Sequence, residues 1–161
     1  MPITYSIADI LEIAQVAERN GAKFYRKAAV AFPDPELKKL LLDLAAMEDA
    51  HVIVFAGIRA GLSEADYRPL VSEPSDRPAS YVDAVAEGRV LDFRADPSSR
   101  LTGHETLADI LKIAIQLEKD AIVFYSALRE RAPRDTDKIQ FVIRQEMKHV
   151  AQLSEELAAL N

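Results

Sequence analysis

The stretch Glu146-Met147-Lys148-His149 places a carboxylate and an imidazole three residues apart. The stretch Met47-Glu48-Asp49-Ala50-His51 contains the same spacing 98 positions earlier. Residues three apart lie on one face of an α-helix, about one turn from each other, so both side chains can reach one metal ion. A single Glu-x-x-His occurs often by chance. Two copies at matching places in one chain indicate a metal site built from helices.

The two copies belong to a longer internal repeat. Ala8-Asp9-Ile10-Leu11 recurs as Ala108-Asp109-Ile110-Leu111, and Glu18 recurs as Glu118, each 100 positions later. A helical hairpin therefore occurs twice. Each copy carries one Glu on its first helix and a Glu-x-x-His on its second helix.

Hydrophobic periodicity and capping residues predict four long helices in a single domain. Capping boxes at Ser6–Asp9 and Thr106–Asp109 begin the first and third helices, and Asp34 followed by proline begins the second. The predicted helices cover about residues 6–32, 35–60, 107–131 and 137–160. Residues 62–103, which contain four prolines, form a long crossover with a short helix expected within 81–92. We therefore expect an all-α four-helix bundle.

The inward-facing stripe of each predicted helix is apolar until mid-helix, where a carboxylate interrupts it. No Lys or Arg lies on these stripes, and burying unpaired ionised carboxylates costs several kcal/mol. Two divalent cations would balance four carboxylates. The predicted metal ligands are Glu18, Glu48, His51, Glu118, Glu146 and His149. We identify no catalytic residue distinct from these ligands.

Composition excludes several classes of protein. The chain has 161 residues with a net charge of −6, so no basic patch is available for nucleic acid. It has no cysteine, which excludes disulfides, zinc ribbons and rubredoxin-type iron sites. The sequence lacks both an apolar run of about 18 residues and a signal-peptide pattern. We expect a cytoplasmic protein that does not enter a membrane.

These features together resemble the rubrerythrin-like branch of the ferritin-like di-iron carboxylate superfamily. The resemblance covers all four helices and rests on Glu18 to Tyr25, Met47 to His51, Glu118 to Tyr125, and Glu146 to His149. It implies a ferritin-like fold, with the long crossover between the second and third helices. It also implies two iron ions bridged by Glu48 and Glu146, with Glu18 and Glu118 as terminal ligands and one His on each ion. Manganese or zinc accept the same ligand types.

The chain departs from the rubrerythrin pattern at two points. Rubrerythrins carry a further Glu one turn after the third-helix ligand, where this chain has Ala121. They also carry a rubredoxin-like domain with four cysteines, and this sequence has none. The ligand set is therefore more symmetric, and a built-in electron donor is missing.

Three residues near the predicted ligands, Tyr25, Tyr125 and Gln145, have open roles. Tyr25 and Tyr125 follow the terminal glutamates by seven residues, near the place where rubrerythrins have tyrosines beside the ligands, but buried tyrosines in bundles also serve packing alone. Gln145 could hydrogen-bond a ligand histidine, whereas its counterpart Met47 could not. Glu12 points to another face and is expected in solvent.

The leading functional hypothesis is a di-iron oxidoreductase acting on H₂O₂ or O₂, of the peroxidase or ferroxidase type, with H₂O₂ expected to react faster. An external donor, such as a rubredoxin or a flavoprotein, would have to return the electrons. The alternative is a metal-binding or iron-handling protein with little turnover. The four carboxylates argue against a third reading, a metal-free interaction module. We also expect a homodimer, because the crossover carries Tyr67, Tyr81 and Phe93 beyond the needs of one bundle.

Overall fold

The computed structural model describes residues 5–69 and 77–160. Its α-helices are α1 (Ile7–Ala31), α2 (Pro35–Ala60), α3 (Arg77–Ala86), α4 (Leu107–Arg131) and α5 (Thr136–Ala158). Short 3₁₀ turns occupy η1 (Glu64–Tyr67), η2 (Pro97–Arg100) and η3 (Pro133–Asp135). The four long helices match the predicted bounds to within two residues. The short crossover helix exists but begins earlier than expected, at Arg77, and residues 70–76 of the crossover lie outside the described residues.

The helix starts follow from local hydrogen bonding. The Ser6 hydroxyl accepts from the backbone N–H of Asp9 at 3.1 Å, and the Asp9 carboxylate accepts from the N–H of Ser6 at 2.9 Å. Thr106 and Asp109 repeat this capping box at the start of α4. Asp34 accepts a hydrogen bond at 2.8 Å from the third residue of α2. These contacts satisfy backbone donors that a helix N-terminus leaves free, and so fix where each helix begins.

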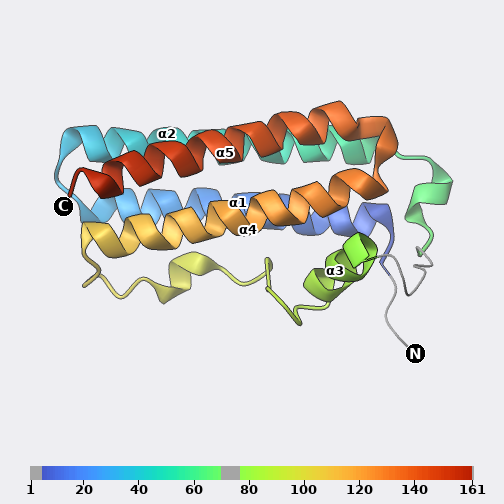
Figure 1. Cartoon of the computed structure of the whole chain (residues 1–161), viewed down its shortest axis with the longest axis horizontal. Coiled ribbons are helices and arrows are strands. Elements are labelled where there is room, and N and C mark those ends of the chain that lie inside the picture. The colour runs from blue at the N-terminus through green and yellow to red at the C-terminus, as the bar shows by residue number, and fades with distance from the viewer. Residues whose placement is uncertain (1–4, 70–76, 161) are drawn as a thin grey trace.

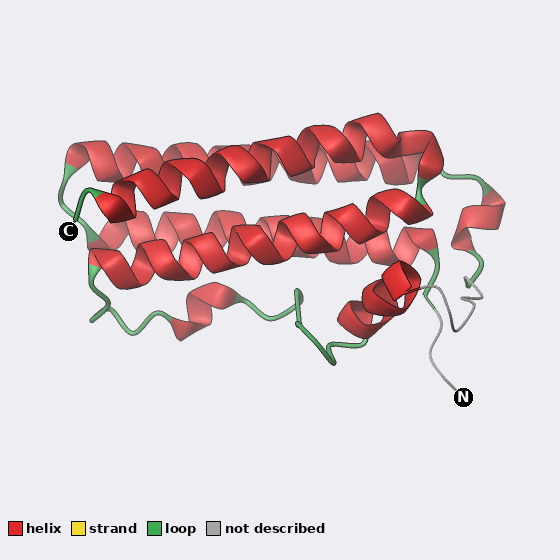
Figure 2. Cartoon of the chain, in the orientation of Figure 1, coloured by secondary structure: helices red, strands yellow, loops and turns green. Residues whose placement is uncertain are grey.

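The four long helices form one bundle made of two antiparallel hairpins, α1–α2 and α4–α5 (Figure 1). The described part of the crossover that follows residue 76 runs along the bundle to the start of α4 (Figure 1). The helices α2 and α4 point in the same direction, and α1 is antiparallel to α4 (Figure 1). The part of the chain that the structure describes contains helices and loops but no strand (Figure 2). No helix of that part combines the length and apolar character needed to cross a lipid bilayer.

The apolar core is divided into two clusters, one toward each end of the bundle. The first includes Leu11, Phe55 and Ile139, and the second includes Leu41 and Leu111. Each cluster draws residues from all four long helices. A layer of buried polar side chains lies between the two clusters, at the middle of the helices.

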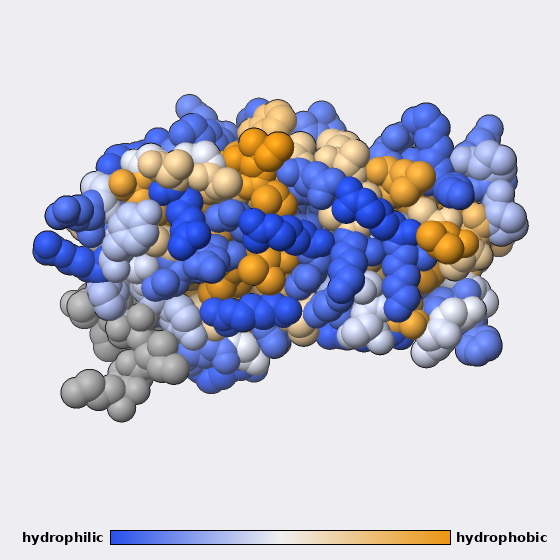
Figure 3. Space-filling model, turned by 180° about the vertical axis from the view of Figure 1, so that it is seen from behind, coloured by the Kyte–Doolittle hydropathy of each residue, from blue (hydrophilic) through white to orange (hydrophobic). Residues whose placement is uncertain are grey.

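Residues 91–101 of the crossover, here called the strap, cover the groove between α1 and α4 (Figure 1). Phe93 of the strap stacks on Phe124 of α4, with ring centroids 4.9 Å apart, and Tyr81 of α3 packs against the first core cluster. Of the three crossover aromatics invoked for a dimer, only Tyr67 stays exposed. The face of the bundle opposite the view of Figure 1 is mostly hydrophilic, with separate hydrophobic groups (Figure 3). The homodimer therefore stays a prediction. The crossover exposes less aromatic surface for a dimer contact than the sequence indicated, because Tyr81 and Phe93 pack against the bundle.

Candidate metal centre

The polar layer at mid-bundle consists of the six side chains predicted as metal ligands. They follow the helix repeat: α1 and α4 each contribute one Glu, and α2 and α5 each contribute a Glu and a His. All six are buried, at most 5% exposed. The set is Glu18, Glu48, His51, Glu118, Glu146 and His149.

The six side chains form two overlapping groups whose candidate ligand atoms lie within 4.8 Å of one another. One group is Glu18, Glu48, His51 and Glu146, and the other is Glu48, Glu118, Glu146 and His149. Two glutamates are therefore shared, and each group adds one further Glu and one His. The resemblance implied the same grouping, with the two shared glutamates as bridging and the other two as terminal ligands, and that assignment stays a prediction.

The two histidines turn their Nδ1 atoms toward the carboxylates. His51 Nδ1 lies 2.9 Å from Glu146 Oε1 and 3.3 Å from Glu18 Oε2. His149 Nδ1 lies 2.9 Å from the other oxygen of Glu146, and 3.5 Å from both Glu48 Oε1 and Glu118 Oε1. The two rings stack with centroids 5.9 Å apart. Glu146 thus contacts the imidazoles of both His51 and His149, whereas Glu48 lies close to that of His149 alone among the contacts of the described residues.

The two tyrosines cross between the hairpins. Tyr25 on α1 donates its hydroxyl to Glu118 on α4, and Tyr125 on α4 donates to Glu18 on α1. Burial, and next the charge of the facing glutamate, raise the pKa of each phenol well above its usual value, so both keep their protons and remain donors. Each tyrosine therefore orients the terminal glutamate of the opposite repeat. The sequence pattern left the choice between a packing role and a site role open, and these contacts place both hydroxyls at the site.

Protonation follows from burial and from the histidine contacts. Burial raises the pKa of Glu48 well above its usual value and that of Glu118 to about 8. Burial alone would raise the pKa of Glu146 too, but the imidazoles of His149 and His51, whose Nδ1 atoms each lie 2.9 Å from one of its oxygens, lower it to about 2. Burial would lower both imidazole pKa values, yet contact with the carboxylates raises them to about 10 for His51 and about 9 for His149. Protons thus partly substitute for metal charge in the metal-free site.

Several buried polar atoms of this layer have no hydrogen-bond partner among the described residues. They are Glu48 Oε1, both carboxylate oxygens of Glu146, and His149 Nδ1. His149 Nδ1 and Glu146 Oε2 are close, at 2.9 Å, but the angle between them is not that of a hydrogen bond. Unsatisfied buried oxygens are rare in proteins and normally have a partner. Here they belong to the two shared glutamates and converge with imidazole nitrogen, a donor set that suits iron, manganese or zinc.

Of the residues near the ligand set, Glu12 lies where the sequence predicted, whereas Gln145 and Met47 do not have the predicted roles. Glu12 is exposed and pairs with Arg59 at 3.0 Å, as expected for a solvated position. Gln145 makes no hydrogen bond to either histidine within the described residues. Its counterpart Met47, which the sequence analysis dismissed, places Sδ 3.4 Å from His149 Nε2. A thioether is a weak acceptor, and polarity alone gave no signal for this contact.

Comparisons with known proteins support the fold. A solved structure described as a ferritin-like diiron-carboxylate protein from Thermotoga maritima matches with a TM-score of 0.73 and 24% sequence identity, over the whole of both chains. No protein-family model matches the sequence, and no curated protein does. At this identity the match establishes the fold: the chain is an all-α, ferritin-like four-helix bundle with a long crossover between α2 and α4, as the sequence predicted.

Proposed function

We propose that the chain is a rubrerythrin-like di-iron oxidoreductase that reduces H₂O₂ or O₂, as a peroxidase or ferroxidase. The observation that carries the proposal is the pair of overlapping four-residue groups sharing Glu48 and Glu146. In this proposal Glu48 and Glu146 would be shared by two iron ions, Glu18 and His51 would hold one of them, and Glu118 and His149 would hold the other. The Thermotoga maritima protein of the same fold, described as a diiron-carboxylate protein, supports the choice of metal.

A bound pair of ferrous ions supplies two electrons at adjacent positions. The protein's part is to hold the ligands and to exclude water. Tyr25 and Tyr125 keep the terminal carboxylates oriented through their hydroxyl protons. The apolar clusters on both sides of the layer shield it from bulk solvent. On metal binding the imidazoles and the protonated Glu48 and Glu118 must release protons, so uptake is expected to be pH-dependent.

An external electron donor completes the proposal. The sequence contains no cysteine, so no rubredoxin-type centre within it can return electrons to the ions. A separate rubredoxin or flavoprotein is the proposed source. Without such a donor, oxidation should stop after about one H₂O₂ per two ferrous ions, because each peroxide takes up two electrons.

The experiment is anaerobic loading with ferrous iron, elemental analysis, and stopped-flow mixing with H₂O₂ or with O₂. We expect about two ions per chain and faster oxidation by H₂O₂. The matched control is the Glu48→Ala/Glu146→Ala double variant, which should take up no iron pair. An equal or faster reaction with O₂ would refute the peroxide preference. Continued peroxide consumption by the purified chain with no reductant would refute the need for a donor.

One observation favours a second candidate, a metal-binding or iron-handling protein with little turnover. Ala121 stands one turn after Glu118, where rubrerythrins have the further glutamate that exchanges with a histidine as iron changes oxidation state. Without it the ions have fewer ligand changes available. Tight binding of two ions with slow oxidation by both oxidants would support this candidate over the first.

A further inference from the structure

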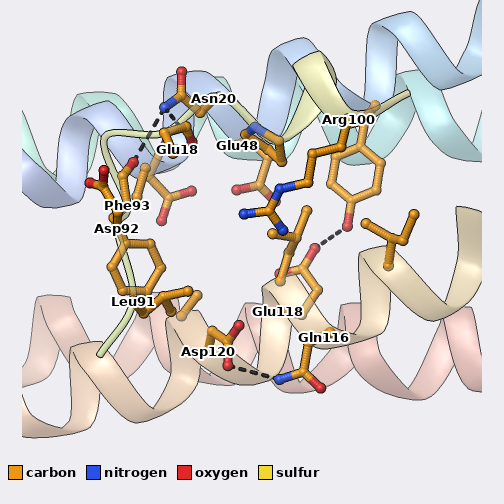
Figure 4. A pocket seen from close by; sticks show the side chains of 18 of the residues that line it. Glu18, Asn20, Glu48, Leu91, Asp92, Phe93, Arg100, Gln116, Glu118 and Asp120 are labelled. Atoms are coloured by element: carbon orange, nitrogen blue, oxygen red, sulfur yellow. Dashed lines mark hydrogen bonds between the residues drawn. The ribbon is translucent and has the colours of Figure 1, made fainter. Parts of the chain in front are cut away.

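A cavity of about 190 Å³ lies beside the carboxylate layer, between α1, α4 and the strap. Its floor is formed by Glu18, Glu48 and Glu118, all nearly inaccessible to solvent, together with both tyrosines. Figure 4 shows these carboxylates facing the space from α1, α2 and α4. The cavity therefore gives an approach to the candidate metal centre from one side of the bundle.

The cavity is larger than either proposed oxidant needs. A cavity of about 150 Å³ accommodates benzene, whereas a molecule of water-like size occupies about 30 Å³. Most of the wall is apolar, contributed by Leu91, Phe93 and Pro97 of the strap and by Ile113, Leu117 and Ala121 of α4. Space of this size and polarity fits a six-carbon ring or a short alkyl chain better than peroxide.

Small residues create this space in both repeats. Gly21 on α1 and its repeat counterpart Ala121 on α4 both line the cavity, one turn beyond the terminal glutamates. A Cβ added at Gly21 would already approach Glu48 Oε2 to 3.3 Å. Ala121, which read as a missing ligand in the sequence, is in the structure a position where the helix leaves room beside the carboxylates.

Arg100 is the one Lys or Arg among the described residues that line the cavity. It is exposed, at the rim, and its side chain points from the strap into the cavity toward the Glu48 and Glu118 side (Figure 4). Within the described residues it forms no ion pair with any carboxylate, although the other strap arginine, Arg94, donates to Ala86 O at 2.6 Å. The cavity wall is largely apolar, but five acidic side chains also line it: Glu18, Glu48, Asp92, Glu118 and Asp120. Arg100 is the one basic side chain among the described lining residues, so it is the group suited to an anionic part of a ligand.

The strap that carries Arg100 is fixed to α1. The Asn20 side-chain amide lies within hydrogen-bonding distance of three strap carbonyls, those of Phe93, Arg94 and Ala95, at 3.3–3.4 Å. Lys27 donates to the carbonyl of Ser98 at 2.7 Å. The strap backbone is thus held by α1 at residues 93–95 and at Ser98, which fixes the part of the chain that carries Arg100.

We propose that this cavity binds a small organic carboxylate, with its apolar body against the strap and α4 and its carboxylate paired with Arg100. Asp92 lies at the opposite end of the cavity from Arg100 in Figure 4, so it does not compete for the guanidinium. Glu48 and Glu118 lie on the Arg100 side, but within the described residues neither forms an ion pair with Arg100. The apolar body then lies next to the candidate metal ligands. This adds an organic ligand to the proposed metal centre, and it is tested separately from metal binding.

The test uses benzoate and its uncharged analogue benzamide, titrated by calorimetry into the full chain both metal-free and loaded with Zn²⁺. Benzoate is expected to bind more tightly than benzamide in both forms. Arg100→Gln should weaken benzoate by about tenfold or more and leave benzamide nearly unchanged, because it removes a charge-assisted hydrogen bond. The matched control is Arg144→Gln, which removes an exposed arginine of α5 outside the cavity.

A second variant tests the cavity itself. Ala121→Leu fills the space and should abolish binding of both compounds, while elemental analysis reports separately whether the metal site still loads. Equal affinity for benzoate and benzamide, or an unchanged benzoate affinity in Arg100→Gln, would overturn the role of Arg100. Benzoate binding that needs Zn²⁺ and ignores Arg100 would mean that the ions alone hold the anion. No binding of either compound by the unaltered chain would overturn the cavity proposal.

Discussion

The two hairpins offer the same ligand types in the same register, yet they hold them in different electrostatic surroundings. In the second hairpin, both oxygens of Glu146 lie 2.9 Å from an imidazole Nδ1. In the first, Glu48 is 3.5 Å from His149 alone. Consequently the histidines lower the pKa of Glu146 to about 2, whereas burial holds that of Glu48 well above its usual value. The two repeats therefore carry the same types of candidate ligand, but the corresponding glutamates Glu48 and Glu146 differ in their tendency to be charged.

A second difference lies on the outside of the bundle. The strap, which carries Arg100, covers the α1–α4 side, and the cavity lies between the strap and the bundle. The crossover is the segment that occurs once, so it has no counterpart in the repeat. The duplicated part therefore builds the candidate metal centre, and the unduplicated part lines the cavity beside it.

The largest expected effect is on the rise in Tm that iron causes, and it should differ between variants of the shared glutamates and variants of the terminal glutamates. Loading iron should raise Tm by about 10 °C or more, because two sites at a hundred times Kd contribute about 5 kcal/mol. The Glu48→Ala/Glu146→Ala double variant should lose this rise completely, since each of the two groups of candidate ligands loses two of its four members. Glu18→Ala/Glu118→Ala should lose only part of it. Differential scanning calorimetry with and without iron measures the effect.

The exposed Glu12→Ala change is the control and should keep the full rise in Tm. If the terminal pair matters as much as the shared pair, the division into bridging and terminal carboxylates is wrong.

Next in size is the comparison of Glu146→Gln with Glu48→Gln in the metal-free protein at about pH 6. Glutamine resembles a protonated glutamate, so replacing Glu48 should change the free energy of unfolding by about 0.5 kcal/mol or less. Replacing Glu146 removes the charge that both histidines face, and this should lower the free energy of unfolding by about 1–3 kcal/mol. Urea titration measures both values. Equal losses would show that the two hairpins share the charge evenly.

The pH dependence of stability should distinguish metal-free from loaded protein. Glu118, His51 and His149 have folded pKa values raised to about 8, 10 and 9, so their stabilising contributions are present at low pH and are lost as pH rises through those values. The lowered pKa of Glu146 acts in the opposite sense, and its contribution is lost as pH falls from about 4.5 toward 2. The metal-free protein should therefore be most stable near pH 5–6.

Loaded protein should behave differently, because metal ligands must be deprotonated and protons compete with the ions in acid. Between about pH 5 and 9 the Tm of metal-free protein should fall while that of loaded protein holds or rises. Parallel curves for the two forms would contradict the protonation assigned to the site.

The sequence predicted the helical bundle and the six buried Glu and His side chains of the mid-bundle layer because both follow from helix periodicity. A stripe at a spacing of three and four fixes which side chains face inward, and Glu18, Glu48 and their counterparts interrupt that stripe. The unequal pKa values could not be predicted, since they depend on interatomic distances of a few ångströms. Arg100 could not be predicted either, because a crossover has no periodicity to place its side chains.

The smallest expected effect concerns Gly21, whose repeat counterpart is Ala121. Alanine in place of a mid-helix glycine stabilises a helix by about 0.5–1 kcal/mol. The added Cβ would lie 3.3 Å from Glu48 Oε2, and in the metal-free protein that long side chain can move aside. Gly21→Ala should therefore stabilise metal-free protein slightly. Once Glu48 is held by two ions it cannot move, so the same change should weaken iron binding.

The control for this change is Gly57→Ala on α2, where an added Cβ meets no atom within 4 Å. It should stabilise metal-free and loaded protein equally, because the gain comes from helix propensity alone. The measurement is the difference between loaded and metal-free Tm for each variant. That difference should shrink for Gly21→Ala and stay constant for Gly57→Ala. If the difference between loaded and metal-free Tm stays constant for both variants, then metal does not fix Glu48. In that case close approach to Glu48 does not explain why Gly21 stands where the second repeat has Ala121.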